Sequence, residues 1–168
     1  MIVDDFTNDG LMSKLGTHWR VSSDKVMGGI SEGSIIKTSF NGVKCLHLNG
    51  QVKLENNGGF IQAGLDLAFF QKGFDVSEYK GLRLTVAGSL HRYSIHLRTT
   101  QIKRPWQSYR AHFFPELTWG TLELPFSVFV PHRIKAAMDT SKLRRIGIVA
   151  IGRVFQPNLF ISEIKFIK

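Results

Sequence analysis

Residues 19–33 read Trp-Arg-Val-Ser-Ser-Asp-Lys-Val-Met-Gly-Gly-Ile-Ser-Glu-Gly, and this stretch sets the pattern for the rest of the chain. Gly28 and Gly29 lack a Cβ, so the backbone can turn sharply there or approach another element closely. Asp24 and Ser31 flank the turn, and side chains of these types hydrogen-bond to nearby backbone N–H groups. We therefore expect residues 24–31 to form a specified corner between two strands.

A second glycine pair recurs thirty residues further on, where Asn57 precedes Gly58 and Gly59, and Phe60 follows them. Either pair alone is typical of an ordinary turn that connects two strands. Because both lie among strand-like runs, their recurrence indicates a β scaffold in which the corners are fixed by sequence.

The remaining apolar patterns are those of strands, with no long amphipathic helix, internal repeat or linker. Asn41-Gly42 between two such runs is a strong hairpin signal. Short helical turns are expected in 67–74 and 125–129, and 131–143 is interpreted as a loop with one turn. The expected strands are residues 3–6, 19–22, 34–40, 43–52, 59–66, 81–87, 92–100, 108–114, 119–124, 145–151 and 158–167. About ten strands in 168 residues predict a single all-β domain, residues 1–168, built as a sandwich or barrel.

Charge is distributed unevenly along the chain. The net charge is +9, yet residues 1–78 hold seven Lys and Arg against nine Asp and Glu, whereas residues 79–168 hold fifteen against four. Between Tyr79 and Pro115 there are seven basic residues and no acidic one. Such an imbalance favours an anionic partner: an acidic protein, phospholipid headgroups or nucleic acid.

Strand alternation places the basic side chains of residues 81–114 on one face, because successive side chains of a strand point to opposite faces. If the three strands in this region are neighbours in one sheet, they form a cationic patch, the candidate binding surface. A solvated outer face, where arginine is common, is the alternative interpretation. The patch would consist of Arg83, His96, Arg98, Arg110 and His112.

No catalytic residue, cofactor or metal site is predicted. The six histidines lack zinc-ligand spacing, and His96 with His112 has no evident further ligand. Asp24 and Glu55 fit turn-stabilising roles better than those of a glycosidase pair. Asp4 and Asp5 leave open a structural calcium ion, since oxygen ligands cannot be counted from sequence.

The location expected from the sequence is the cytoplasm, with attachment to the periphery of the inner membrane as an option. The acidic start of the chain is unlike a signal or transit peptide, and no apolar run approaches the roughly 20 residues that cross a bilayer. The single cysteine, Cys45, excludes an internal disulfide and is interpreted as a buried core residue.

The aromatic residues suggest two classes of ligand, nucleic acid and carbohydrate. Residues 103–110 interleave basic and aromatic side chains as single-strand binders do, but alternation places Tyr109 in the core and leaves only Trp106 as a stacking platform. Nucleic acid is therefore not expected. Trp19, Trp106 and Trp119 are candidate platforms for a carbohydrate, which is the alternative ligand.

The chain resembles, over essentially its whole length, the family of complex I intermediate-associated proteins, which are assembly factors of NADH:ubiquinone oxidoreductase. Residues 61–64, Ile-Gln-Ala-Gly, depart from the family pattern of a small residue followed by arginine. The motif residues that carry the resemblance are Trp19, Asp24, Met27, Gly28, Gly29, Ser31, Asn57, Gly58, Gly59 and Phe60, with support from 81–82, 93–99, 109, 119, 125–129 and 145–148.

The resemblance implies a jelly-roll β-sandwich of the galactose-binding-like kind, in a free-standing bacterial-type member. It also implies a non-catalytic role in which binding is the activity. We expect the basic half to bind an acidic protein or a membrane-peripheral complex, such as respiratory complex I subunits. A carbohydrate or small-ligand module on the same scaffold is the alternative.

Overall fold

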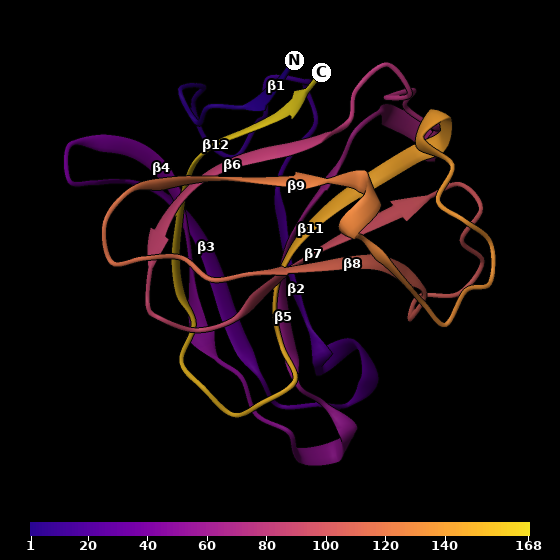
Figure 1. Ribbon diagram of the computed structural model, residues 1–168. Coiled ribbons are helices and arrows are strands. Elements are labelled where there is room, and N and C mark those ends of the chain that lie inside the picture. Colours follow the sequence, from indigo (N-terminus) through magenta and orange to yellow (C-terminus); the bar gives the residue numbers. More distant parts are fainter.

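The computed structural model describes residues 1–168 and is a sandwich of two six-stranded sheets (Figure 1). The strands are β1 (Ile2–Asp4), β2 (Arg20–Ser23), β3 (Glu32–Phe40), β4 (Val43–Gln51), β5 (Phe60–Asp66), β6 (Gly81–Gly88), β7 (Tyr93–Thr99), β8 (Ser108–Phe113), β9 (Gly120–Pro125), β10 (Val130–His132), β11 (Leu143–Ile151) and β12 (Asn158–Ile167). One sheet has the order β3-β4-β12-β6-β9, with β1 also paired to β12, and the other has the order β10-β8-β7-β11-β5-β2. All the pairings are antiparallel. The predicted all-β class is confirmed.

Helical structure is limited to single 3₁₀ turns: η1 (Asp24–Met27), η2 (Glu55–Asn57), η3 (Phe69–Gln71), η4 (Phe126–Val128) and η5 (Thr140–Lys142). The turns expected in 67–74, 125–129 and 131–143 are η3, η4 and η5. The expected loop over 131–143 is wrong at its start, because β10 pairs there with β8. A three-residue edge strand with Pro131 at its centre carries no alternation from which it could be recognised.

The hairpin between β3 and β4 shows how local sequence sets register. Phe40 pairs with Val43, so Asn41 and Gly42 form the two-residue connection. Their φ angles are 48° and 76°. Both fall in the left-handed region that this tight turn requires and that Asn and Gly tolerate.

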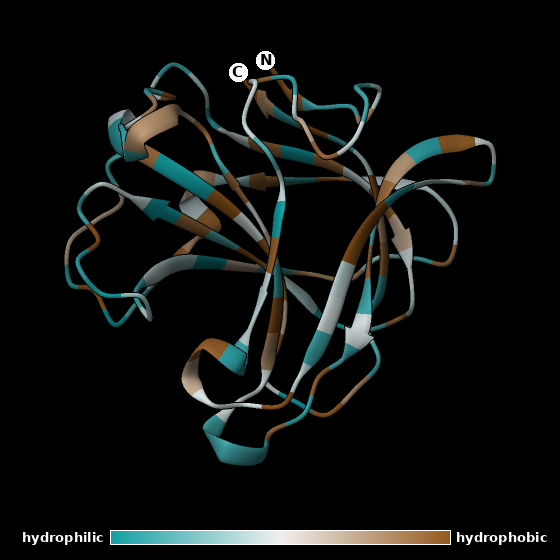
Figure 2. Ribbon diagram, turned by 180° about the vertical axis from the view of Figure 1, so that it is seen from behind, coloured by the Kyte–Doolittle hydropathy of each residue, from teal (hydrophilic) through white to brown (hydrophobic).

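The core lies between the two sheets and forms one cluster of 33 buried residues. Apolar and polar residues alternate along most strands, visible as changing colours along the ribbons (Figure 2). β11 is central in its sheet, and the run from Ile146 to Ala150 is buried on both faces. Trp19 is a core anchor, 2% exposed, and its indole N–H donates to the Asp4 carboxylate at 2.8 Å.

The two chain ends lie together at one end of the sandwich (top of Figure 1), and η1 and η2 lie at the other. At the end that holds the two termini, β1 pairs with the last part of β12. The N-terminal ammonium of Met1 donates to the Phe166 carbonyl at 2.9 Å. No helix of the chain has the length and apolar character needed to cross a bilayer.

Candidate functional site

The motif corner is organised around a buried carboxylate, that of Asp24, which is 0% exposed. Its Oδ1 accepts the Ser31 amide at 2.9 Å, and its Oδ2 accepts the Ser31 hydroxyl at 2.5 Å. Oδ2 also accepts the amides of Gly59 at 2.5 Å and Phe60 at 3.3 Å. Asp24 therefore joins the first glycine corner to the second, a connection between residues 35 apart in sequence.

Burial raises the pKa of Asp24, but the hydrogen bonds from Ser31, Gly59 and Phe60 outweigh it and leave the pKa below its usual value. The carboxylate is thus held in its charged form by donors from two corners. Local turn bonding was predicted for Asp24 and Ser31. The longer connection to Gly59 has no spacing rule that would reveal it.

Within each glycine pair, one residue adopts a positive φ, and the other leaves room for a neighbouring side chain. Gly28 and Gly59 have φ values of +85° and +130°, where L side chains are strained. A Cβ at Gly29 or Gly58 would instead overlap the Asp24 carboxylate. The two pairs therefore let the backbone wrap around one buried side chain.

The remaining motif residues face outward. Met27 is 59% exposed, Asn57 is exposed with a φ of 59°, and Phe60 is half-buried. Val26 beside Met27 is 78% exposed. The motif is thus a structural clamp with an apolar tip on its outer side.

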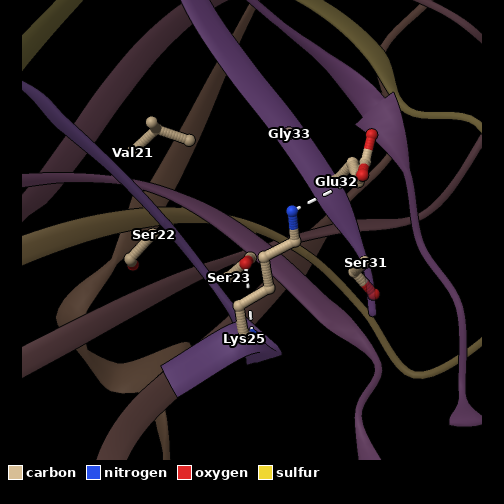
Figure 3. A pocket seen from close by; sticks show the side chains of 7 residues that line it. All are labelled: Val21, Ser22, Ser23, Lys25, Ser31, Glu32 and Gly33. Atoms are coloured by element: carbon tan, nitrogen blue, oxygen red, sulfur yellow. Dashed lines mark hydrogen bonds and ion pairs between the residues drawn. The ribbon is translucent and has the colours of Figure 1, made fainter. Parts of the chain in front are cut away.

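Beside this corner lies a shallow pocket of about 260 Å³, where the edge strands β2 and β3 of the two sheets approach each other (Figure 3). The side chain of Lys25 extends across it toward Glu32, and the two charges are 3.5 Å apart. Because both groups are largely exposed, this pair spans the pocket without closing it.

The expected adjacency of the three basic strands is correct for two of them. β7 and β8 are neighbours, with His96 opposite Arg110 and Ser94 opposite His112. The inclusion of Arg83 is wrong, because β6 belongs to the other sheet, where Arg83 bonds to Glu123 at 2.6 Å. Consecutive strands are usually neighbours, but here the chain crosses between the sheets after β6.

The outer face of the β10-β8-β7-β11-β5-β2 sheet is nevertheless the basic one. Its strands contain five arginines and one acidic residue, whereas the strands of the opposite sheet contain four of each kind. The charged residues in the strands of the β10-β8-β7-β11-β5-β2 sheet are Arg20, Arg98, Arg110, Arg144, Arg145 and Asp66. Those in the strands of the opposite sheet are Lys37, Lys44, Arg83, Lys165, Asp4, Glu32, Glu123 and Glu163. Among the strand residues, the excess of positive charge therefore lies in one of the two layers.

His96 lies within this face and is only 7% exposed. Burial, with the positive charge of Arg110 and smaller contributions from His132, His112 and Arg98, lowers its pKa to about 3. Its Nε2 has no hydrogen-bond partner. The imidazole is therefore neutral at ordinary pH.

The guanidiniums beside His96 are crowded. Arg98 lies opposite Arg145 on β11. Burial, then Arg144 and Arg145, lower the pKa of Arg98 to about 10, while Asp66 acts in the opposite sense. The Nε atoms of Arg98 and Arg144 are buried without partners. Unbalanced positive charge is thus built into this face.

The tryptophans differ in their exposure. Trp106 is 54% exposed in the loop between β7 and β8, beside Pro105, whose carbonyl accepts from Arg98 at 2.7 Å. Trp119 is half-buried, with its indole N–H bonded to the Phe40 carbonyl at 3.1 Å and its ring edge against Phe40. Of the three candidate platforms, only Trp106 presents much of its surface to solvent.

A second hollow of about 190 Å³ opens on the basic face where β2, β5 and β11 lie side by side. Gln62, Gly64 and Asp66 of β5 line it, together with Arg20 and Arg145 of the flanking strands. These residues were not predicted to form a ligand site. The available signal was a glycine inside a strand pattern, at residue 64, which often marks a close approach.

The arrangement of strands and faces defines a jelly-roll β-sandwich of the kind found in binding modules. Several solved structures share this fold, among them the family 11 carbohydrate-binding module of the cellulosomal cellulase Lic26A-Cel5E of Clostridium thermocellum, with TM-score 0.77, 15% identity, and 99% of this chain and 93% of that chain covered. A family 11 module from the same organism, in complex with a β-1,3-1,4-mixed-linked tetrasaccharide, has TM-score 0.75 and 15% identity, with 99% of this chain and 94% of that chain covered. The family 30 module of the cellulosomal cellulase Cel9D-Cel44B of Clostridium thermocellum has TM-score 0.70 and 17% identity, with 99% of this chain and 96% of that chain covered. No curated protein matches the sequence.

The family described as Complex I intermediate-associated protein 30 (CIA30) matches residues 5–161. The chain belongs to this family, as the motif residues predicted.

Proposed function

We propose that this protein is a non-catalytic binding domain of the assembly-factor type, and that its basic face binds an acidic protein surface. The description of its family names intermediates of complex I. The partner proposed here is accordingly an acidic protein or membrane-peripheral complex, such as subunits of respiratory complex I. Binding would take place in the cytoplasm, at the periphery of the inner membrane.

The observation that carries this proposal is the imbalance of five arginines against one carboxylate in the strands of one sheet. Arg98 and Arg144 lie close to each other and to Arg145, and burial weakens the hydration of Arg98 and Arg144. Carboxylates of a partner would relieve both costs, because charge-assisted hydrogen bonds from guanidinium to carboxylate are among the stronger ones in proteins.

The experiment is capture of partners from a cell extract by the immobilised chain, at low and at moderate salt. A specific acidic partner should be retained at low salt and reduced at moderate salt, because screening weakens contacts between exposed charges. Arg110→Gln should reduce its capture. Arg83→Gln, which removes the same charge from the opposite sheet, should not.

The capture experiment contradicts the proposal if no salt-sensitive partner is retained. It does so equally if Arg83→Gln and Arg110→Gln lower capture to the same extent, since the effect would then follow net charge and not the face.

A carbohydrate-binding module is the second candidate function, and the shared fold with such modules supports it. Trp19 is buried and Trp119 is packed against Phe40, so Trp106 is the platform that this candidate must use. Retardation of the chain in gels that contain soluble β-glucan, abolished by Trp106→Ala, would favour it over the first. Equal mobility with and without polysaccharide would reject it.

A further inference from the structure

The hollow on the basic face has the features of a built pocket. It lies over the outer side of β2, β5 and β11, and Val21 is the one apolar residue in its lining. Its volume of about 190 Å³ is below the usual range of drug-sized sites, so it suits a small group. The polar side chains around it are His18, Arg20, Ser22, Gln62, Asp66 and Arg145.

Two glycines face each other at this hollow: Gly64 lines it, and Gly147 lies beneath the side chain of Gln62. Gly64 on β5 lies directly opposite Gly147 on β11. Neither has a φ in the left-handed region, so backbone conformation does not require glycine at either position. Glycine inside a strand destabilises it by roughly 0.5–1 kcal/mol and often marks a close approach of a ligand.

The carboxamide of Gln62 occupies the space that these glycines leave. A Cβ at Gly147 would come 2.6 Å from Gln62 Oε1, and one at Gly64 would come 3.3 Å from Gln62 Nε2. The amide therefore lies across both glycines, where one group supplies a donor and an acceptor to the hollow.

The two arginines flank the hollow from different strands. Arg145 donates its Nε–H to Asp66 Oδ1 at 2.7 Å, which fixes the direction of its guanidinium. Arg20 lies opposite Gly64 on the outermost strand and takes part in none of the seven ion pairs of the chain. One guanidinium is thus oriented by a carboxylate, and the other has no acidic partner.

This set of side chains defines the chemistry of a ligand. Guanidinium groups match the oxygens of carboxylates and phosphates in geometry and charge. The amide of Gln62, the hydroxyl of Ser22 and the second oxygen of Asp66 suit hydroxyl groups. No Phe, Tyr or Trp lines the hollow, so a neutral sugar would lack the large stacking surface that such rings provide.

We propose that this pocket binds a small hydroxylated oxyanion, such as a sugar that carries a phosphate or a carboxylate group. The anionic group would lie between Arg20 and Arg145, and its hydroxyl groups over Gln62 and Asp66. This site is additional to the proposed binding of a protein partner, and it lies on the β2 side of the same face.

The test is a titration of the ¹⁵N-labelled chain with glucose 6-phosphate, glucuronate, inorganic phosphate and glucose, followed by amide chemical shifts. Saturable shifts at Gly64, Gly147 and the Gln62 side-chain amide are expected with glucose 6-phosphate or glucuronate, and which of the two binds more tightly identifies the oxyanion. Inorganic phosphate should bind more weakly, because it lacks the hydroxylated part. Glucose should produce no shifts in this region.

Two variants and a matched control place the ligand. Arg20→Gln and Arg145→Gln should each weaken binding about tenfold or more, since each removes a charge-assisted contact. Arg20 is exposed and unpaired, so its replacement leaves the fold intact. Arg83→Gln removes a comparable cross-strand ion pair, at 2.6 Å against 2.7 Å for Arg145, from the opposite sheet and should leave binding unchanged.

The inference is overturned if neither acidic sugar shifts these resonances at millimolar concentration, or if glucose binds equally well. It is also overturned if Arg20→Gln has no effect. If the wild-type chain captures a partner protein but binds neither acidic sugar, the proposed pocket is rejected and the proposed function is not. Ligand binding without any captured protein would support it and count against the proposed function.

Discussion

His96 on β7 lies directly opposite Arg110 on β8, and the pairing holds a neutral imidazole beside a guanidinium inside the basic face. The sequence predicted both side chains to lie on this face. It gave no sign that His96 would be buried, because alternation assigns a face and says nothing of what covers it.

The depressed pKa of His96 makes stability depend on pH. In the unfolded chain the imidazole takes up a proton near its ordinary value of 6.5, whereas in the folded chain it does so only near 3. The unfolded state therefore binds more protons between these values, and stability falls as pH falls through 6.5. Between about pH 7 and about pH 5 this loss is about 2 kcal/mol from His96. His96→Gln should reduce the loss, as measured by urea unfolding at the two pH values.

The control for this prediction is His112→Gln on the neighbouring strand. His112 is exposed, so its replacement should leave most of the pH dependence in place. An identical slope in the wild type and in His96→Gln would show that the imidazole is not held neutral by burial.

The Asp24 carboxylate supports a second prediction. Asp24→Asn keeps one acceptor oxygen but points an NH₂ group toward buried backbone donors, so it should destabilise the fold by about 3 kcal/mol in urea unfolding. Asp75→Asn is the comparison, because Asp75 is exposed and accepts only from Ser77, two residues away. Its replacement should cost about 1 kcal/mol or less. Equal effects of the two would contradict the role given to the corner.

The same carboxylate contributes to the acid limit of stability. Its folded-state pKa lies below the ordinary value of 3.8, so its contribution is present above about pH 4 and is lost as pH falls toward the folded-state pKa. The stability difference between the wild type and Asp24→Asn should therefore shrink below about pH 4.

A third prediction concerns Gly50 on β4, which pairs with Gly33 on β3. Its φ is +153°, and an added Cβ would overlap the carbonyl oxygen of Glu32. Gly50→Ala should destabilise the chain by about 3 kcal/mol or more, since the backbone of β3 must shift. Gly120→Ala, where an added Cβ has nothing within 4 Å, should stay within about 0.5 kcal/mol. Thermal unfolding of the two variants gives the comparison.

A fourth prediction concerns the ion pair between Arg83 and Glu123 on the sheet opposite the basic face. The Arg83–Glu123 pair is 2.6 Å long, but its side chains are 36% and 47% exposed. Solvent screening limits such a pair to about 0.5 kcal/mol, so Arg83→Gln should unfold at nearly the wild-type urea concentration. A larger loss would disqualify it as a neutral control for the basic face.

Features that depend on residues close together in the sequence could be predicted from it. Features that depend on contacts between distant residues could not. Asn41-Gly42 and the alternation that places Tyr109 in the core are local signals, and both agree with the observed structure. The separation of β6 from β7 depends on a crossing between the sheets, so adjacency along the chain misplaced Arg83. The pocket between Arg20 and Arg145 joins residues far apart in sequence, and no spacing rule connects them.

The Asp24 corner links the local opening of one sheet to that of the other. Ser31 immediately precedes a strand of one sheet, and Gly59 immediately precedes a strand of the other. The Ser31 amide donates to Oδ1 and the Gly59 amide to Oδ2 of the same carboxylate, so a displacement of Asp24 removes both acceptors at once. Deuterium exchange at the two amides should therefore give the same opening free energy, and this end of the sandwich should open as one cooperative unit.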